Sequence, residues 1–312
     1  MPDLRAPGGK LPAPARSGFY NPDPPSGKGR DDRASSFRPT RRRHPPRIPR
    51  GRGAVPVVAA PLPADSGPRA PPPGLTVVLP AYRDAANVLP GVEAVERSLR
   101  ATGWDYEILL IEDAGGDGAA EVIRGLAGEN PRVRFLLHER NRGRGATVAE
   151  GIREARGEFA GYLDIDMEVA AHYLVPMVEL LREGRCDLVV ARRDYRVSLG
   201  PSFLLRHVLS SGYRRLVRSV LPLPVHDTEA GYKFFRRAAI LPVLDRCRDP
   251  HWFWDTEVCV RAHLAGLRLA EVPALFVRRA DKASTVRVVR DTWLHFRALH
   301  RLRSEIRAAR RP

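Results

Sequence analysis

The sequence predicts an α/β protein in which a mostly parallel sheet is flanked by helices and is preceded by a disordered N-terminal arm. Short apolar runs rich in β-branched residues alternate with stretches of helical spacing. Residues 1–73 differ sharply in composition from this alternating part. Strands that alternate with helices are typical of a parallel sheet covered on both faces.

The predicted elements begin at Leu75. Strands are expected at residues 75–79, 107–111, 133–137, 159–163 and 187–191. Helices are expected at residues 87–102, 119–127, 146–155, 173–182 and 252–265. Asp227 begins a turn that leads into an aromatic strand, and two short strands are expected within 269–277, on either side of Pro273. Residues 203–221 mix apolar residues with arginine, which predicts either an amphipathic surface helix or an interfacial membrane helix.

The two ends of the chain carry most of its charge. Residues 1–73 hold 18 of the 29 prolines and 14 Lys and Arg against 5 Asp, and we expect this arm to be disordered. Residues 287–312 hold 8 Arg against 2 acidic residues and are expected to form a basic C-terminal helix. The predicted folded domain, residues 74–286, is left with a net charge of only +1.

This distribution bears on the partners and the location of the protein. A nucleic-acid-binding domain carries a basic face on the fold itself, so no specific nucleic acid is expected. Basic ends suit the anionic cytoplasmic surface of a membrane, where each nearby Lys or Arg contributes about 1 kcal/mol. The sequence has no apolar run of about 20 residues and no signal-peptide core. Its three scattered cysteines favour a reducing compartment. We therefore expect a cytoplasmic protein that is soluble or peripheral, and the basic ends favour a peripheral position on the cytoplasmic face of the membrane.

Two carboxylates one residue apart, Asp164 and Asp166, end the apolar run at 159–163. On an extended segment these alternate side chains share one face, where they raise each other's proton affinity unless a cation lies beside them. Mg2+ commonly takes one or two protein carboxylates together with substrate phosphates. The pair therefore predicts a Mg2+ or Mn2+ site, and a solvated strand end is the alternative interpretation. The loops at 80–84 and 112–117 are expected at the same edge of the sheet, where ligands bind in such folds.

Seven motifs occur in order along the chain: Pro80-Ala-Tyr-Arg-Asp84, Glu112-Asp113, Asn141-Arg-Gly-Arg-Gly145, Asp164-Ile-Asp166, Arg193, Arg206 with Ser210, and Arg279 with Ser284. Together they resemble the family 2 inverting glycosyltransferases of the GT-A (Rossmann-like) fold, in the branch of the dolichol-phosphate mannose synthases and polyprenyl-phosphate glucosyltransferases. The resemblance covers residues 75 to about 290. It implies inverting transfer of mannose or glucose from GDP-mannose or UDP-glucose to a polyprenyl or dolichyl phosphate.

The resemblance assigns the donor and the metal to named residues. It implies that Asp164 and Asp166 bind the metal ion. The residues that it places at the nucleoside diphosphate sugar are Pro80, Tyr82, Asp84, Glu112, Asp113, Arg144, Asp164 and Arg193. The chain departs from the usual pattern at Glu112, where Asp is common, and at Gly115 and Ala119, where hydroxyl residues are common.

The resemblance places Arg206 and Arg279 at the acceptor, although Lys282 and Thr285 depart from the last motif. A lipid monophosphate is largely dianionic at pH 7, so it needs charge neutralisation more than it needs a base. Asp227 is assigned to acceptor or sugar contact, with base catalysis as the alternative. Asp255 and Glu257 are weaker candidates, because acidic residues are favoured at the start of a helix in any case.

Two further functions remain open. The same donor chemistry could serve a saccharide or other hydroxyl acceptor, which requires a general base. A different class of function is an inactive GT-A fold that acts as a membrane or nucleic-acid adaptor.

Overall fold

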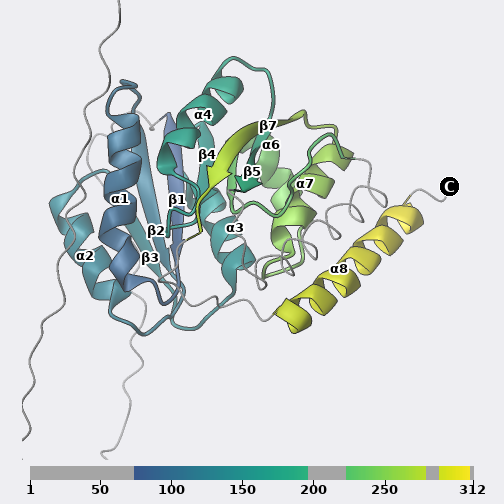
Figure 1. Ribbon diagram of the computed structural model, residues 1–312, viewed down its shortest axis with the longest axis horizontal. Coiled ribbons are helices and arrows are strands. Elements are labelled where there is room, and N and C mark those ends of the chain that lie inside the picture. Colours follow the sequence, from purple (N-terminus) through teal and green to yellow (C-terminus); the bar gives the residue numbers. More distant parts are fainter. Residues whose placement is uncertain (1–73, 196–222, 279–287, 310–312) are drawn as a thin grey trace, which may run out of the picture. The chain divides into compact units, whose positions relative to one another are not determined.

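The computed structural model describes residues 74–195, 223–278 and 288–309 (Figure 1). The predicted N-terminal arm and the predicted helix at 203–221 lie outside these residues. So do two residues predicted at the acceptor, Arg206 and Arg279.

Seven strands form one sheet in the order β3-β2-β1-β4-β6-β5-β7. Their bounds are Leu75–Ala81 (β1), Tyr106–Glu112 (β2), Val133–Leu137 (β3), Phe159–Leu163 (β4), Leu188–Tyr195 (β5), Tyr232–Arg236 (β6) and Leu269–Phe276 (β7). Only β6 runs against its neighbours: it pairs antiparallel with β4 and β5, and the other pairs are parallel. The predicted mostly parallel sheet is therefore confirmed.

Helices cover both faces of this sheet (Figure 1). Their bounds are Ala85–Leu99 (α1), Ala119–Glu129 (α2), Arg144–Glu154 (α3), Ala171–Tyr173 (η1, a 3-10 turn), Leu174–Arg182 (α4), Arg237–Leu244 (α6), Trp254–Leu264 (α7) and Val288–Ala309 (α8). None of the helices in the described ranges combines the length and the apolar character that crossing a bilayer requires.

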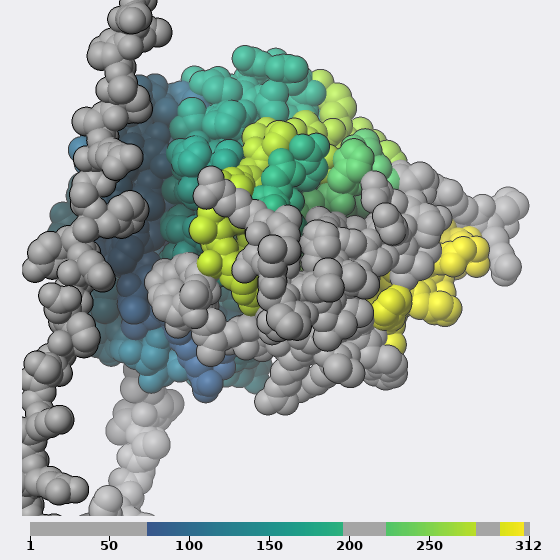
Figure 2. All heavy atoms as spheres, viewed as in Figure 1, coloured from purple at the N-terminus to yellow at the C-terminus, as the bar shows by residue number. Residues whose placement is uncertain are grey.

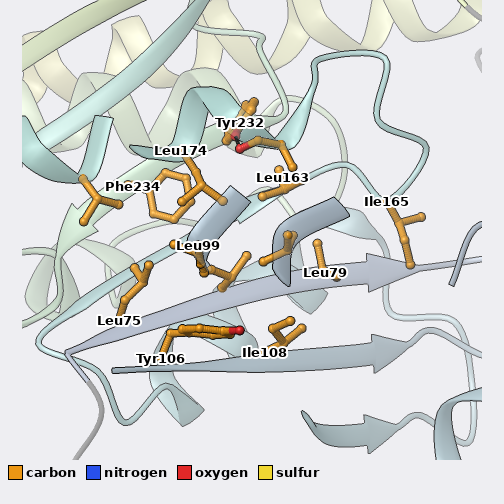
Figure 3. Packing of buried hydrophobic residues seen from close by; sticks show 14 of the residues in the cluster. Leu75, Leu79, Leu99, Tyr106, Ile108, Leu163, Ile165, Leu174, Tyr232 and Phe234 are labelled. Carbon is orange, nitrogen blue, oxygen red and sulfur yellow. Dashed lines mark hydrogen bonds between the residues drawn. The ribbon is translucent and has the colours of Figure 1, made fainter. Parts of the chain in front are cut away.

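The continuously apolar strands supply a core on each face, because alternate residues of a strand point to opposite sides. In β1, Val77 and Leu79 join a cluster with α1 and α4, of which Figure 3 shows part. Val78, between them, packs on the other face with Val148 of α3 and Val258 of α7. The long helix α8 packs separately against α7 through residues such as Leu299, and it lies at the surface in Figure 2.

The prediction of two short strands around Pro273 is wrong, because β7 continues through this proline. Proline has no backbone N–H to donate to a sheet, so it is tolerated where a strand has a neighbour on one side only. β7 is the edge strand of the sheet, and Pro273 lies opposite Arg192 of β5.

Gly161 in β4 is expected to be intolerant of any side chain. A Cβ atom there would lie 2.1 Å from Cδ1 of Phe234 and 2.5 Å from the Lys233 carbonyl oxygen. We expect Gly161→Ala to lower the unfolding free energy by about 1–3 kcal/mol, the usual cost of overpacking. The matched control is Gly125→Ala in α2, where nothing lies within 4 Å. It should raise stability by about 0.5–1 kcal/mol. Equal losses of unfolding free energy in the two variants, measured by urea unfolding, would contradict the role of close packing at Gly161.

Candidate active site

The predicted donor loops meet at the carboxyl edge of the sheet. β1 and β2 pair so that Pro80 lies opposite Ile111 and Ala81 opposite Glu112. The backbone N–H of Asp113 donates to the Ala81 carbonyl over 2.9 Å. The loop that follows β1 and carries Tyr82, whose ring is exposed, therefore lies beside the Glu112-Asp113 pair.

The carboxylates of these loops stabilise the loop conformations through hydrogen bonds. Glu112 accepts hydrogen bonds from the backbone N–H groups of Ala114 (3.1 Å) and Gly115 (2.5 Å). Asp84 accepts one from the Asn87 side chain (3.0 Å), and Asp117 accepts one from the N–H of Ala85, the first residue of α1, over 2.8 Å. The acidic side chains thus hold the two loops together at the start of α1.

Asp113 organises the glycine-rich loop that precedes α3. Its buried carboxylate accepts hydrogen bonds from the N–H groups of Arg142 (2.8 Å) and Gly143 (3.0 Å) and from the Asn141 side chain (2.9 Å). The ring of His138 lies 2.6 Å away. Burial alone raises the pKa of Asp113, but these hydrogen bonds outweigh it and hold the pKa below its ordinary value. The two predicted motifs, Glu112-Asp113 and 141–145, are therefore parts of one unit.

The proposed metal pair, Asp164 and Asp166, lies in a turn. β4 ends at Leu163, and the N–H of Met167, a residue with φ of 56°, donates to the Asp164 carbonyl over 3.2 Å. The expectation that an extended segment aligns the two carboxylates is therefore wrong, and the turn brings them together instead. Partial burial raises the pKa of Asp164 above its ordinary value, although 45% of the side chain is exposed; the nearby Arg144 guanidinium opposes this shift, and the Asp166 carboxylate adds to it.

The donor set at this turn fits a hard divalent cation. Two carboxylates offer oxygen ligands only, and within the described ranges no third His, Cys, Asp or Glu joins them in a cluster. Mg2+ is often held by one or two carboxylates while substrate phosphates and water supply the remaining ligands. Oδ2 of Asp164 lies against Gly231, where an added Cβ atom would be 2.0 Å away. The glycine leaves this oxygen room.

A buried group of charges lies behind the turn. Arg144 donates to Oδ1 of Asp164 through Nε (3.1 Å) and Nη2 (2.6 Å), and through Nη1 to Asp255 (2.5 Å). Lys233 and the hydroxyl of Tyr162 also donate to Asp255. Asp255 was only a weak candidate from the sequence, because acidic residues are common at helix starts. A signal for the group was the lysine inside the aromatic strand Tyr232–Arg236, since a buried lysine needs an anionic partner.

Arg193 and Asp227, predicted at the donor and at the catalytic centre, form one ion pair. Asp227 is fully buried and accepts hydrogen bonds from Nε (2.7 Å), Nη2 (2.9 Å) and the backbone N–H (3.1 Å) of Arg193. Its own N–H donates to Glu271 over 3.0 Å. The carboxylate of Asp227 is thus engaged within the protein. Glu257, by contrast, turns away from this edge and pairs with Arg261.

Comparison with known proteins gives the family. Residues 76–242 match the family described as Glycosyl transferase family 2. Glycosyltransferase AglD of Haloferax volcanii is 34% identical over 221 residues, which are 70% of this chain and 35% of that protein. The dolichyl-phosphate beta-glucosyltransferase of Dictyostelium discoideum is 25% identical over 214 residues, 64% of each chain. The chain thus spans between about one third and two thirds of the length of these relatives.

Two solved structures share the architecture. Glucosyl-3-phosphoglycerate synthase from Mycobacterium tuberculosis, in complex with Mn2+, UDP and glucosyl-3-phosphoglycerate, aligns with a TM-score of 0.55 at 16% identity, over 74% of this chain and 80% of that one. Mannosyl-3-phosphoglycerate synthase from Rubrobacter xylanophilus aligns with a TM-score of 0.55 at 18% identity, over 75% of each chain. At these identities the likeness concerns the fold, and it agrees with the predicted GT-A class.

Proposed function

The chain belongs to glycosyl transferase family 2, and on this basis we propose that it transfers a hexose, with inversion, from a nucleoside diphosphate sugar to a polyprenyl or dolichyl phosphate. The dolichyl-phosphate beta-glucosyltransferases among its relatives support this acceptor class. Mannose and glucose, carried by GDP or UDP, are the candidate sugars.

The donor would lie along the edge formed by the loops after β1, β2 and β4. We assign the nucleoside to the surface at Pro80, Tyr82, Asp84, Glu112 and Asp113, and the cation, Mg2+ or Mn2+, to Asp164 and Asp166. When bound, such a cation neutralises the charge that develops on the departing diphosphate. The binding of Mn2+ and UDP by the mycobacterial synthase of the same fold supports this choice.

The ion pair of Arg193 with Asp227 is the observation that favours a phosphate acceptor over a hydroxyl acceptor. A hydroxyl acceptor must lose its proton as it attacks, so the enzyme needs a free base near the new bond. Asp227, the candidate base, is instead held by three N–H groups of Arg193. A phosphate monoester is already largely dianionic at pH 7 and needs no such base. Arg206 and Arg279 are the residues we propose to neutralise it, since the planar guanidinium suits phosphate oxygens.

A basic surface would bring the protein to its lipid acceptor. On α8, Arg297, Arg301 and Arg307 are exposed together with Leu294 and Phe296. Arginine beside exposed apolar side chains favours binding to anionic lipid headgroups. We therefore propose a peripheral position on the cytoplasmic face of a membrane.

The test is an incubation with UDP-glucose or GDP-mannose, Mg2+ or Mn2+, and a prenyl phosphate in anionic or neutral vesicles. We expect labelled hexose to enter the lipid only when both metal and prenyl phosphate are present, and faster in anionic vesicles. Arg206→Ala and Arg279→Ala should each slow this transfer. Full transfer to a saccharide without prenyl phosphate would overturn the acceptor, and transfer to neither would favour a non-catalytic adaptor.

A further inference from the structure

Asp255 forms ion pairs with two buried, positively charged side chains, Lys233 and Arg144. The Lys233 side chain is fully buried, and only 12% of the Arg144 side chain is exposed. Each donates to Asp255, Lys233 over 2.7 Å to Oδ1 and Arg144 over 2.5 Å to Oδ2. A buried charge without a partner is unfavourable, so both cations depend on this carboxylate. The attraction of Arg144 and Lys233 holds the pKa of Asp255 below its ordinary value, although burial opposes it.

Glycines bring Arg144 within reach of Asp255. Arg144 is the first residue of α3 and lies between Gly143 and Gly145. A Cβ atom at Gly143 would be 2.5 Å from the Pro250 carbonyl oxygen, and one at Gly145 would be 2.4 Å from Cβ of Trp254. The start of α3 can therefore approach the start of α7 only because neither glycine has a side chain. Asp255 is the second residue of α7.

The Arg144 guanidinium has a fixed orientation. Its central carbon lies 5.4 Å from the ring centroid of Tyr162 and 5.3 Å from that of Trp252. Two of its nitrogens donate to the same oxygen of Asp164, Oδ1, and the third donates to Asp255. The guanidinium thus determines how the Asp164 carboxylate is turned, and the other oxygen, Oδ2, lies beside Gly231.

We propose that Asp255 is a positioning residue for the cation site: through Arg144 it fixes the Asp164 carboxylate and shares the charge of the guanidinium. Without Asp255, the full charge of Arg144 would act on Asp164 and compete with a cation for it. Lys233 and the hydroxyl of Tyr162 hold Asp255 in its place. This inference rests on the assignment of the metal to Asp164 in the proposed function, and it concerns the protein alone, without donor or acceptor.

The test measures Mn2+ binding to the full chain through the loss of the electron paramagnetic resonance signal of free Mn2+. We expect Asp255→Asn to weaken Mn2+ binding about 10- to 100-fold, as is typical when a residue that orients a ligand is lost. The matched control is Glu257→Gln, two residues along the same helix. Glu257 is also buried and is paired with Arg261, at 2.6 Å, away from the metal turn. This variant should lower the melting temperature but keep Mn2+ affinity within about twofold of the wild type.

Further variants distinguish a positioning role of Asp255 from a purely stabilising one. Arg144→Gln removes the orienting group together with its competing charge, so it should weaken Mn2+ binding less than Asp255→Asn does. The double variant should bind Mn2+ no more weakly than Asp255→Asn, because residues that act as one unit are not additive. If Asp255→Asn does not fold, Tyr162→Phe removes only a hydroxyl that donates to Asp255. Its Mn2+ affinity should then fall.

The outcomes distinguish this inference from the proposed function. Unchanged Mn2+ affinity in folded Asp255→Asn, or in Tyr162→Phe if that variant replaces it, overturns the positioning role and leaves the transferase assignment intact. If the wild-type protein binds Mn2+ and the Asp255→Asn variant does not, the inference is supported. If the same wild-type protein transfers no hexose, the proposed transfer reaction is overturned. A wild-type protein that binds no Mn2+ overturns both the inference and the metal assignment.

Discussion

Asp164→Asn and Asp166→Asn are each expected to lower hexose transfer by about 1000-fold or more while the protein stays folded. A 1000-fold loss corresponds to about 4 kcal/mol of transition-state stabilisation, which is in the range that a catalytic cation supplies. Asparagine keeps the size of the side chain but removes the negative charge, and at position 164 its amide oxygen can still accept from Arg144. Because 45% of the Asp164 side chain is exposed, we expect little change in stability. Transfer rates and thermal unfolding should be measured on the same samples.

The control is Asp245→Asn, which removes a carboxylate that pairs with Arg153 over 3.2 Å at the surface. This variant should transfer hexose at the wild-type rate. Wild-type activity in both metal-site variants, or transfer that chelators do not affect, would remove the metal from the mechanism.

Asp227→Asn is expected to lower the unfolding free energy by about 3–5 kcal/mol, which is the usual cost of leaving one member of a buried ion pair without its partner. Asp227 is fully buried, and Arg193 binds it with two side-chain nitrogens and its backbone N–H. The substitution leaves the Arg193 charge without a full counter-charge. Urea unfolding monitored by circular dichroism measures the loss.

The chain contains a matched control for this prediction. Asp187 is bound by Arg268 in the same way, through Nε (3.0 Å), Nη2 (2.9 Å) and the backbone N–H (2.9 Å). However, 56% of the Arg268 side chain is exposed, and solvent screens exposed pairs. Asp187→Asn should therefore cost much less than Asp227→Asn. Equal losses in the two variants would contradict the role of burial.

Activity of the same variant decides between the two roles of Asp227. Folded Asp227→Asn should still transfer hexose to a prenyl phosphate, since a phosphate acceptor needs no base. If the folded variant is inactive while Arg206→Ala and Arg279→Ala transfer normally, Asp227 acts as a base and the acceptor is a hydroxyl group.

Much of the sheet could be predicted because its central strands are buried on both faces. Runs such as 75–79 and 107–111 are apolar throughout, and this composition is typical of strands in a covered parallel sheet. The continuity of the edge strand β7 was not predicted, because Pro273 lies within it. The short helix α6, which begins directly after β6, was not predicted either, whereas α1 was predicted although it contains Pro90. Whether a proline breaks an element depends on neighbours that are distant in the sequence.

The candidate site was predictable only as a set of positions. The local pattern identified the carboxylates at 164 and 166, and the family resemblance identified the one at 227, but neither identified the partners that each side chain has in the fold. Arg144 and Asp255 are 111 residues apart, and Arg193 and Asp227 are 34 apart. Which carboxylate is already engaged depends on such long-range pairs. The lysine in the aromatic strand indicated that a buried anion lies nearby, but it did not identify Asp255 as that anion.

The reversed direction of β6 has a consequence for how this enzyme family can diversify. Because β6 runs against β4, its first residue, Tyr232, pairs with the last residue of β4, Leu163, and the chain before β6 meets the metal turn. At the parallel strands, by contrast, the residues at this edge of the sheet are those that follow each strand. The candidate site therefore has two parts that lie apart in the sequence. One part follows β1, β2 and β4, and the other precedes β6. We therefore expect substitutions before β6 to alter the proposed acceptor preference without altering the surface proposed for the nucleotide.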